Sequence, residues 1–120
     1  MPAPYAISEA ARRAGITVHQ ARAYVGAGLV KPCAALPSGY HLFNDACIAR
    51  LRLIGAATRA GLLGREIADL VRALDVNDPQ ALRAARRSLA AAIGTRQAAI
   101  QQLKNIVSAI CNGAITEASP

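Results

Sequence analysis

The chain has 120 residues, enough for one compact domain and one long appended element, and 53% of its residues are hydrophobic. Aromatic residues make up only 3%, so a core of Ala, Leu, Ile and Val favours packed helices over a β-sandwich or barrel. The net charge of +7 is concentrated in residues 1–60, which contain seven basic residues and two acidic ones. This excess favours an anionic partner such as nucleic acid.

Several classes of protein are disfavoured by what the sequence lacks. No apolar run approaches the roughly 20 residues that span a bilayer, and residues 1–15 carry no signal-peptide core. The three cysteines are widely spaced without a CxxC motif, which argues against a disulfide framework and for a reducing cytoplasm. No glycine-rich phosphate loop, carboxylate pair or catalytic triad pattern is present. We therefore expect a cytoplasmic protein that is not an enzyme, needs no cofactor and does not enter a membrane.

Caps and glycines predict two short helices near the start of the chain. The first is expected over 9–14, capped by Ser8 and ended by Gly15. The second is expected over 18–25, with Thr17 as its cap. Two short helices joined by a tight turn are typical of a helix-turn-helix.

The next segment cannot be helical, because it contains Lys31-Pro32 and then Leu36-Pro37-Ser38-Gly39. Proline followed by Ser-Gly predicts a turn between two short extended segments, which together would form a wing.

Two further helices are predicted over 45–60, capped by Asn44 and ended by Gly61, and over 64–74. Their apolar faces recur at three-to-four spacing and supply the candidate core: Ile48, Leu51, Ile54 and either Ala57 or Thr58, then Ile67, Leu70, Val71 and Leu74. A hinge is expected over 75–79, with Asp78 as a cap.

No further proline follows Pro79 up to Ile110, which predicts a helix over 79–110 of about 32 residues and about 48 Å. Two series spaced by seven and offset by four match the a and d positions of a coiled coil, although Arg86 and Arg96 interrupt them. The dimerisation residues are predicted to be Leu82, Leu89, Ile93, Ile100, Leu103, Val107 and Ile110. Asn112-Gly113 is expected to end the helix. The predicted organisation is a DNA-binding domain over 1–75, a dimerisation helix over 79–111 and a flexible tail over 112–120.

The second helix of a helix-turn-helix presents its N-terminal half to the major groove. Gln20 is suited to adenine, and Arg22 to guanine or a phosphate. For Tyr24 two interpretations stay open, a phosphate contact through its hydroxyl and a core aromatic. Arg50 and Arg52 are either phosphate contacts or solvated charges, and Arg12 and Arg13 are further phosphate candidates. The predicted DNA-binding residues are Thr17, Val18, His19, Gln20, Arg22, Tyr24, Lys31, Tyr40 and His41.

The cysteines predict no metal site. Cys33 and Cys47 have no cysteine or histidine at ligand spacing, so buried or inert thiols are expected. Cys111 is the one candidate ligand, because a dimer could bring two copies of it together for a soft metal.

The pattern resembles the MerR family of bacterial transcription regulators between residues 7 and 75. The matching pieces are Ala14-Gly15-Ile16-Thr17-Val18, Arg22-x-Tyr24, Gly28-Leu29-Val30-x-Pro32, Gly39-Tyr40-x-x-Phe43, Arg50-Leu51 and Gly61. The resemblance implies a mainly all-α fold, a winged helix-turn-helix with a small β wing followed by a long antiparallel coiled-coil helix. It also implies a homodimer that binds and deforms double-stranded promoter DNA.

Other details are similar to one branch of the family, the secondary regulators of mercury-resistance operons. These are Val18-His19, Leu42-Phe43, Asp45-Ala46, Ala60-Gly61 and Arg72-Ala73-Leu74-Asp75. This similarity implies a co-regulator that lowers operon expression, with a primary MerR-type regulator or RNA polymerase as a further partner.

The sequence departs from the family's activators at several positions. Ala23 and Val25 stand where the activators have Tyr and Glu, and His41 replaces the usual wing arginine. Mercury sensors of the family have a cysteine at the hinge and two in the loop after the dimer helix. Here residues 75–80 have none, and only Cys111 lies near the loop after the dimer helix.

Two alternatives for the function stay open: an effector-sensing activator that uses Cys111, and a non-enzymatic adaptor or architectural dimer.

Overall fold

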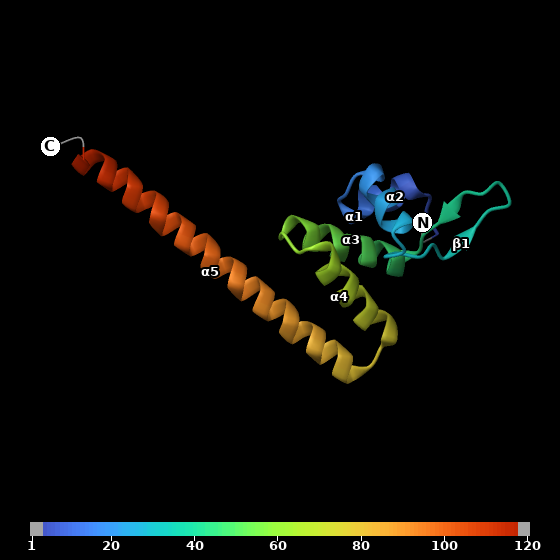
Figure 1. The fold of residues 1–120 in the computed structure, drawn as a ribbon. Helices are drawn as coiled ribbons and strands as arrows, with labels where there is room; N and C mark the ends of the chain where they lie inside the picture. The colour runs from blue at the N-terminus through green and yellow to red at the C-terminus, as the bar shows by residue number, and fades with distance from the viewer. Residues whose placement is uncertain (1–3, 118–120) are drawn as a thin grey trace. The chain divides into compact units, whose positions relative to one another are not determined.

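The structure is a computed structural model that describes residues 4–117. The chain divides into two compact units, an N-terminal unit over 1–75 and a C-terminal unit over 76–120. Five helices and two strands follow one another in the described residues: α1 (Ile7–Ala14), α2 (Val18–Gly26), β1 (Ala34–Ala35), β2 (His41–Leu42), α3 (Asp45–Arg59), α4 (Gly64–Val76) and α5 (Pro79–Glu117) (Figure 1). The predicted fold class, mainly helical with a small β wing and a long final helix, is confirmed.

The first two helices are bounded by local hydrogen bonds. Gly15 ends α1 in the left-handed conformation (φ 74°), where glycine has no Cβ to clash. Thr17 caps α2, as predicted, through a capping box with Gln20. The prediction that Ser8 caps the first helix is wrong. The helix starts earlier, with the Ala10 N–H donating to the Ala6 carbonyl at 2.9 Å, and this start lets Ile7 pack against the core.

The wing is a short antiparallel hairpin in which Ala34 pairs with Leu42 and Ala35 with His41. Its turn follows the predicted Leu36-Pro37-Ser38-Gly39 sequence, since the Gly39 N–H donates to the Leu36 carbonyl at 2.8 Å. Gly39 has φ 93°, a conformation that L side chains rarely adopt. Tyr5 and Phe43 exchange two backbone hydrogen bonds, so the chain's N-terminal segment adds a bridge to the base of the wing.

The core of the N-terminal unit is centred on α3. Asn44 caps α3 by accepting from the Cys47 N–H at 3.0 Å, as predicted. Phe43, Leu51 and Ile54 are fully buried, and Ala57 rather than Thr58 completes the buried face of this helix. Small residues let the first two helices approach closely, and the buried ones are Ala10, Ala11, Ala14 and Ala21.

At Gly55, α3 packs tightly against the helix-turn-helix. A Cβ atom at this position would lie 2.6 Å from Cγ2 of Ile16, which belongs to the turn between α1 and α2. Real Cβ atoms essentially never come so close to another heavy atom. Glycine is therefore required here for packing, whereas its backbone is ordinary helix.

The hinge between α4 and α5 is shorter than the predicted hinge over 75–79. Helix α4 continues to Val76, and Asn77 follows with a left-handed φ of 56°. The Asp78 carboxylate accepts from the Ala81 N–H at 3.3 Å, so Asp78 acts as the predicted cap of α5. Ile67 and Val71 of α4 are buried, while Leu70 and Leu74 are half-buried.

Helix α5 runs to Glu117, so the prediction that Asn112-Gly113 ends it is wrong. One glycine costs a helix interior about 1 kcal/mol, which a helix already many turns long absorbs without ending. The predicted flexible tail over 112–120 is thus helical to residue 117, and residues 118–120 lie outside the described part of the chain. None of the helices between residues 4 and 117 combines the length and apolar character needed to cross a membrane.

Candidate nucleic-acid interface

The N-terminal half of α2 offers mostly exposed side chains. Thr17, His19 and Arg22 are exposed, while Val18 and Gln20 are half-buried. Ala21, one residue before Arg22, is fully buried and holds this helix against the core. Because a buried alanine and exposed polar residues alternate along it, α2 has one face fixed in the domain and another that is accessible.

The capping box uses part of the predicted recognition surface. The Gln20 side-chain oxygen accepts from the Thr17 N–H at 2.9 Å, and Thr17 Oγ1 accepts from the Gln20 N–H at 3.0 Å. A bidentate contact to adenine needs both the oxygen and the nitrogen of the amide. The predicted contact of Gln20 with adenine would therefore require the capping box to open, whereas the Thr17 hydroxyl can still donate its proton.

Arg22 and His19 are the exposed side chains of α2 that have no engagement in the fold. Within the part of the chain that the structure describes, no hydrogen bond or ion pair involves either of them. The Arg22 guanidinium is consequently available with all five of its N–H donors, the geometry that pairs with guanine or phosphate.

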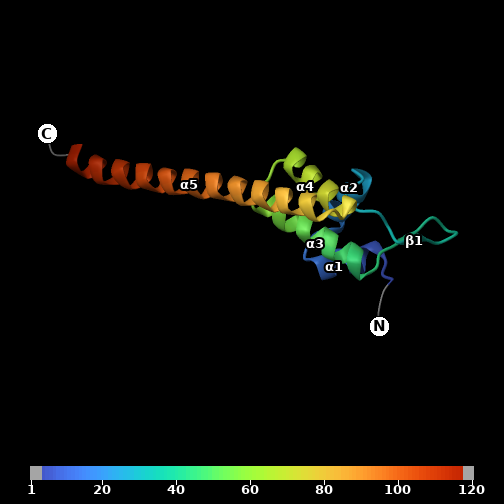
Figure 2. The same cartoon turned by 90° about the horizontal axis from the view of Figure 1, so that it is seen from below.

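The wing carries the second group of exposed candidates. In the N-terminal unit the hairpin of β1 and β2 extends away from the helices, with its turn farthest out (Figure 2). The Tyr40 side chain is 71% exposed, and His41 and Lys31 are also exposed. A tyrosine that stabilises a fold usually buries its ring, and Tyr40 does not. The wing thus presents a phenol, an imidazole and an ammonium group to solvent.

Tyr24 is held by the fold. Its ring packs against the core, and its hydroxyl donates to Oγ1 of Thr58 at 3.3 Å, linking α2 to α3. Thr58 in turn donates to the Ile54 carbonyl at 2.9 Å. Of the two interpretations, this favours the core aromatic, with the hydroxyl satisfied inside the protein.

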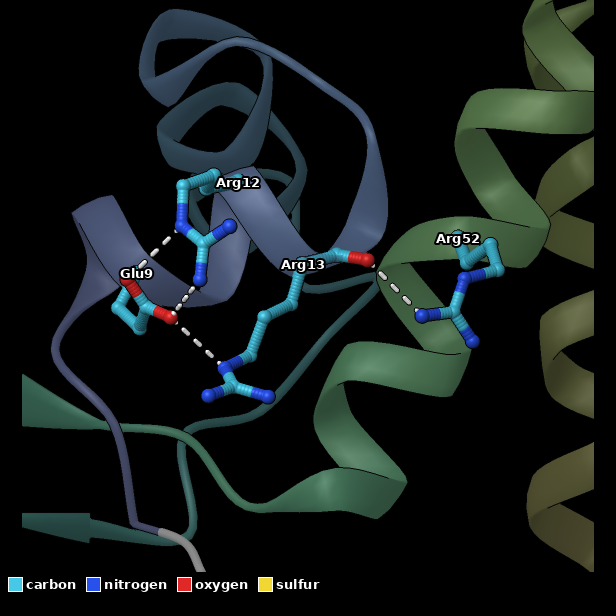
Figure 3. A network of polar contacts seen from close by, with 4 residues as sticks. All are labelled: Glu9, Arg12, Arg13 and Arg52. Atoms are coloured by element: carbon cyan, nitrogen blue, oxygen red, sulfur yellow. Dashed lines mark hydrogen bonds and ion pairs between the residues drawn. The ribbon is translucent and has the colours of Figure 1, made fainter. Parts of the chain in front are cut away.

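The arginines of α1 share one carboxylate (Figure 3). Glu9 accepts from Nε of Arg12 at 3.0 Å and from Nε of Arg13 at 2.8 Å, and Arg13 also lies over the Tyr5 ring at 4.3 Å. The hydrogen bond from Arg12 holds the pKa of Glu9 below its ordinary value, and the same contact raises the pKa of Arg12. Two guanidiniums on one carboxylate leave a net positive charge on the exposed face of this helix.

The two arginines of α3 have structural partners. Arg52 donates to the Arg13 carbonyl at 2.9 Å and so satisfies an acceptor at the end of α1 (Figure 3). Arg50 forms an ion pair with Asp75 at 2.7 Å, which ties α3 to the last residue of the N-terminal unit. Both arginines therefore have a partner within the protein, and whether either also contacts a phosphate stays a prediction.

The predicted dimerisation residues lie along α5, and several of them are exposed. Leu103 is 60% exposed and Ile110 64% exposed, and Ile93, Ile100 and Val107 are exposed as well. Leu82 and Leu89 are half-buried. Ile106, which the two series do not include, is a further exposed apolar residue of the same helix. Apolar side chains at this spacing form a stripe along the helix, and the exposure of this stripe to water is energetically unfavourable.

The cysteines are all free thiols, and two of them line one cavity. Cys33 and Cys47 line the same cavity in the N-terminal unit, although they are separated in the sequence. The Cys111 side chain is exposed. Sequence spacing carried no sign of the shared cavity, because the wing and the first turn of α3 meet only in the folded protein.

Comparisons with known protein families and with individual relatives indicate the same family. The model for the MerR HTH family of regulatory proteins matches residues 5–74. The chain is 45% identical over 74 residues to the HTH-type transcriptional regulator MerD of Pseudomonas aeruginosa, covering 62% of this chain and 61% of that protein. It is 36% identical over 106 residues to MerD of Acinetobacter calcoaceticus, covering 88% of each. The match thus spans about three fifths of the first relative and most of the second.

The fold has a counterpart among solved structures. HiNmlR, a MerR family regulator lacking the sensor domain and bound to promoter DNA, superimposes with a TM-score of 0.72 at 19% identity, covering 88% of this chain and 80% of that one. This likeness concerns the fold. Together with the family match over more than half of the residues, it completes the case from helix-turn-helix, wing and long helix, and the chain belongs to the MerR HTH family of regulatory proteins.

Proposed function

We propose that this protein is a DNA-binding transcriptional regulator that acts as a secondary, down-regulating regulator of a mercury-resistance operon. The observation that carries the DNA-binding part is the exposed Arg22 guanidinium on α2, which has no partner within the described residues, beside an exposed wing. Its MerD relatives and the promoter-bound HiNmlR support the same assignment. A target in the bacterial chromosome or a plasmid would place the protein in the cytoplasm.

The proposed contacts divide by role. Arg22 and His19 would reach base edges in the major groove, and Thr17 would donate its hydroxyl to a phosphate. Tyr40, His41 and Lys31 of the wing would contact the sugar-phosphate backbone, which positions the protein without reading sequence. Because Gln20 and Tyr24 are engaged within the domain, they would support α2 more than they contact DNA.

The proposed assembly is a homodimer through α5. An apolar stripe that includes Ile100, Leu103 and Val107 would be covered by the same stripe of a second copy. A dimer would present two α2 helices to a two-fold symmetric operator. A MerR-type primary regulator or RNA polymerase at the same promoter is a further candidate partner.

The secondary role is supported by side chains that weaken DNA contact. Ala23 is an exposed residue of α2 with no polar group, and His41 gives the wing an imidazole in place of the arginine that is usual in the family's activators. A dimer with fewer cationic contacts binds less tightly and suits a protein that modifies the action of another regulator.

The test is a footprint of the purified full-length protein on the operator of a mercury-resistance operon, with and without the primary regulator, over a series of salt concentrations. We expect protection of the operator that weakens steeply with salt, because phosphate contacts release counterions. Reporter expression should fall when this protein is added to the primary regulator. Salt-insensitive binding without a preferred site would contradict DNA recognition and favour the adaptor alternative. Activation by the protein alone would contradict the down-regulating role.

A further inference from the structure

A cavity of about 370 Å³ lies in the N-terminal unit where the segment leading into the wing meets the start of α3. Its lining includes Cys33, Cys47, Lys31, Arg50 and Asp75. The DNA contacts proposed above do not use this cavity as a site. Its two thiols need an explanation, because both cysteines of the N-terminal unit line this one cavity.

Both cysteines are held in place by their backbones. The Cys33 N–H donates to the Leu42 carbonyl at 2.9 Å, which extends the wing ladder, and the Cys47 N–H donates to the cap Asn44 at 3.0 Å. The thiols themselves have only weak partners, Cys33 Sγ with the Leu42 carbonyl and Cys47 Sγ with the Lys31 carbonyl, each at 3.3 Å. The fold therefore fixes both backbones, and each thiol gives up only one weak hydrogen bond when it loses its proton.

The number of ligands selects the kind of metal. Among residues 4–117 no group of three or more His, Cys, Asp or Glu is placed to hold a metal ion, so a tetrahedral zinc site has too few ligands here. Two thiolates are enough for a soft cation of low coordination number. They also neutralise a divalent ion completely, and a neutral complex suits a cavity whose lining includes Leu29, Val30 and Ala46.

The charged residues of the lining do not compete for such an ion. Asp75 is already paired with Arg50 at 2.7 Å, so its carboxylate is not a vacant hard ligand. Lys31 is a cation and cannot coordinate in its charged form. The two sulfur atoms are thus the soft donors that the cavity offers.

We propose that Cys33 and Cys47 form a dithiolate site for a soft, two-coordinate metal cation such as Hg(II). Binding breaks two S–H bonds, forms two metal–sulfur bonds and releases two protons to solvent, with no change in oxidation state. The bound ion cross-links the start of the wing to the first turn of α3. Occupancy of the site then restrains the wing relative to the helix-turn-helix.

The experiment uses the full-length protein carrying Cys111→Ser, so that the exposed thiol of α5 cannot contribute. The reduced protein is titrated with Hg(II) in a buffer without other thiols, and stoichiometry, proton release and the metal–sulfur coordination number from X-ray absorption are measured. The loaded protein is then dialysed against an excess monothiol, which removes ions held by one cysteine. We expect one ion per chain, two sulfur ligands and two protons released per ion.

Two variants in the same background test the assignment. Cys33→Ser changes an exposed side chain and should keep the fold, which circular dichroism checks, while competitor-resistant binding is lost. Cys47→Ala should lose it as well. The proposal is overturned if Cys33→Ser binds as the parent does, if Cys47→Ala retains half an ion per chain through two Cys33 residues of separate chains, or if the parent binds nothing that resists the monothiol.

Discussion

The arginines of the N-terminal unit differ in whether the fold already uses their charge. Arg50 is paired with Asp75, Arg52 with a backbone carbonyl, and Arg12 and Arg13 with Glu9. Arg22 has none of these engagements among the described residues. A guanidinium without a partner is fully hydrated, so its transfer to a phosphate or a base edge breaks no protein contact. Arg59 and Arg65 likewise have no ion pair or hydrogen bond among the described residues, so Arg22 is singled out as a DNA contact by its place on α2, the second helix of the helix-turn-helix.

Removing Arg22 should weaken operator binding more than removing an equal charge elsewhere. For Arg22→Ala we expect a loss of about 1–3 kcal/mol in operator affinity, the usual worth of a direct contact. Arg72→Ala is the matched control, because Arg72 is exposed on α4 and is paired with Asp69 at 2.9 Å. Fluorescence anisotropy with a labelled operator measures both. Equal losses for the two variants would show that Arg22 acts only through net charge.

Glu9 should make stability depend on acid pH. Its folded-state pKa lies below the ordinary value because Arg12, and then Arg13, donate to it. The unfolded chain therefore binds this proton more readily, so the stabilisation is complete above the unfolded pKa and is lost as the pH falls through the folded pKa. In urea titrations at several pH values, Glu9→Gln should lower the midpoint at neutral pH, and the difference from the parent should vanish in acid. A difference that stays constant with pH would contradict the ion-pair assignment.

At the scale of elements, the helix-turn-helix depends on one close approach rather than on large side chains. Its buried residues are mostly alanine, and Ile16 fills the space that Gly55 leaves open. Alanine buries little apolar area, so the fit between α1, α2 and α3 has to be close for the unit to be stable.

Gly55→Ala should therefore destabilise the N-terminal unit. Overpacking costs about 1–3 kcal/mol, which the roughly 1 kcal/mol gain in helix propensity offsets only in part. Gly94→Ala is the control, since nothing lies within 4 Å of a Cβ at that helical position and only the gain should appear. Thermal unfolding of both variants gives the comparison. A Gly55→Ala protein as stable as Gly94→Ala would show that Ile16 moves aside freely.

At the scale of the whole molecule, each described unit has its own requirement for stability. The N-terminal unit has a buried core of its own, whereas α5 carries an exposed apolar stripe along much of its length. A long helix with such a stripe is marginal in water unless the stripe is covered. Covering it with a second copy would meet this requirement and would also set the number of DNA-binding units in the assembly.

Leu103→Asp should convert the proposed dimer to a monomer. A carboxylate in an apolar seam loses about 1.5–3 kcal/mol of burial per copy and adds a desolvation cost. Gln102→Asp, which adds the same charge outside the two apolar series, should leave the dimer intact. Sedimentation equilibrium of the full-length variants distinguishes the two results. If Leu103→Asp stays dimeric, the seam lies on another face of α5.

Features that depend on a few neighbouring residues could be predicted from the sequence. The caps Thr17, Asn44 and Asp78, the left-handed Gly15 and the Pro-Ser-Gly turn of the wing each follow from hydrogen bonds or backbone preferences within about four residues. The apolar face of α3 follows from helical periodicity in the same way, and the exposed face of α2 follows from the helix-turn-helix pattern.

The errors lay where a local signal competed with the rest of the chain. Ser8 is a good cap in isolation, but packing of Ile7 starts α1 earlier. Asn112-Gly113 is a good stop signal, but the long preceding helix continues through it.

Folding alone brings together segments that are distant in the sequence. The link from Tyr24 to Thr58, the pairing of Arg50 with Asp75 and the shared cavity of Cys33 and Cys47 have no signature in the spacing of their residues. Periodicity and caps depend on interactions within one helix or turn. They do not indicate which surfaces of different elements pack together. The sequence by itself determined the helices, the wing and the exposed arginine of α2. Only the tertiary structure decided which of the other polar and thiol groups are engaged, because that depends on how the elements pack.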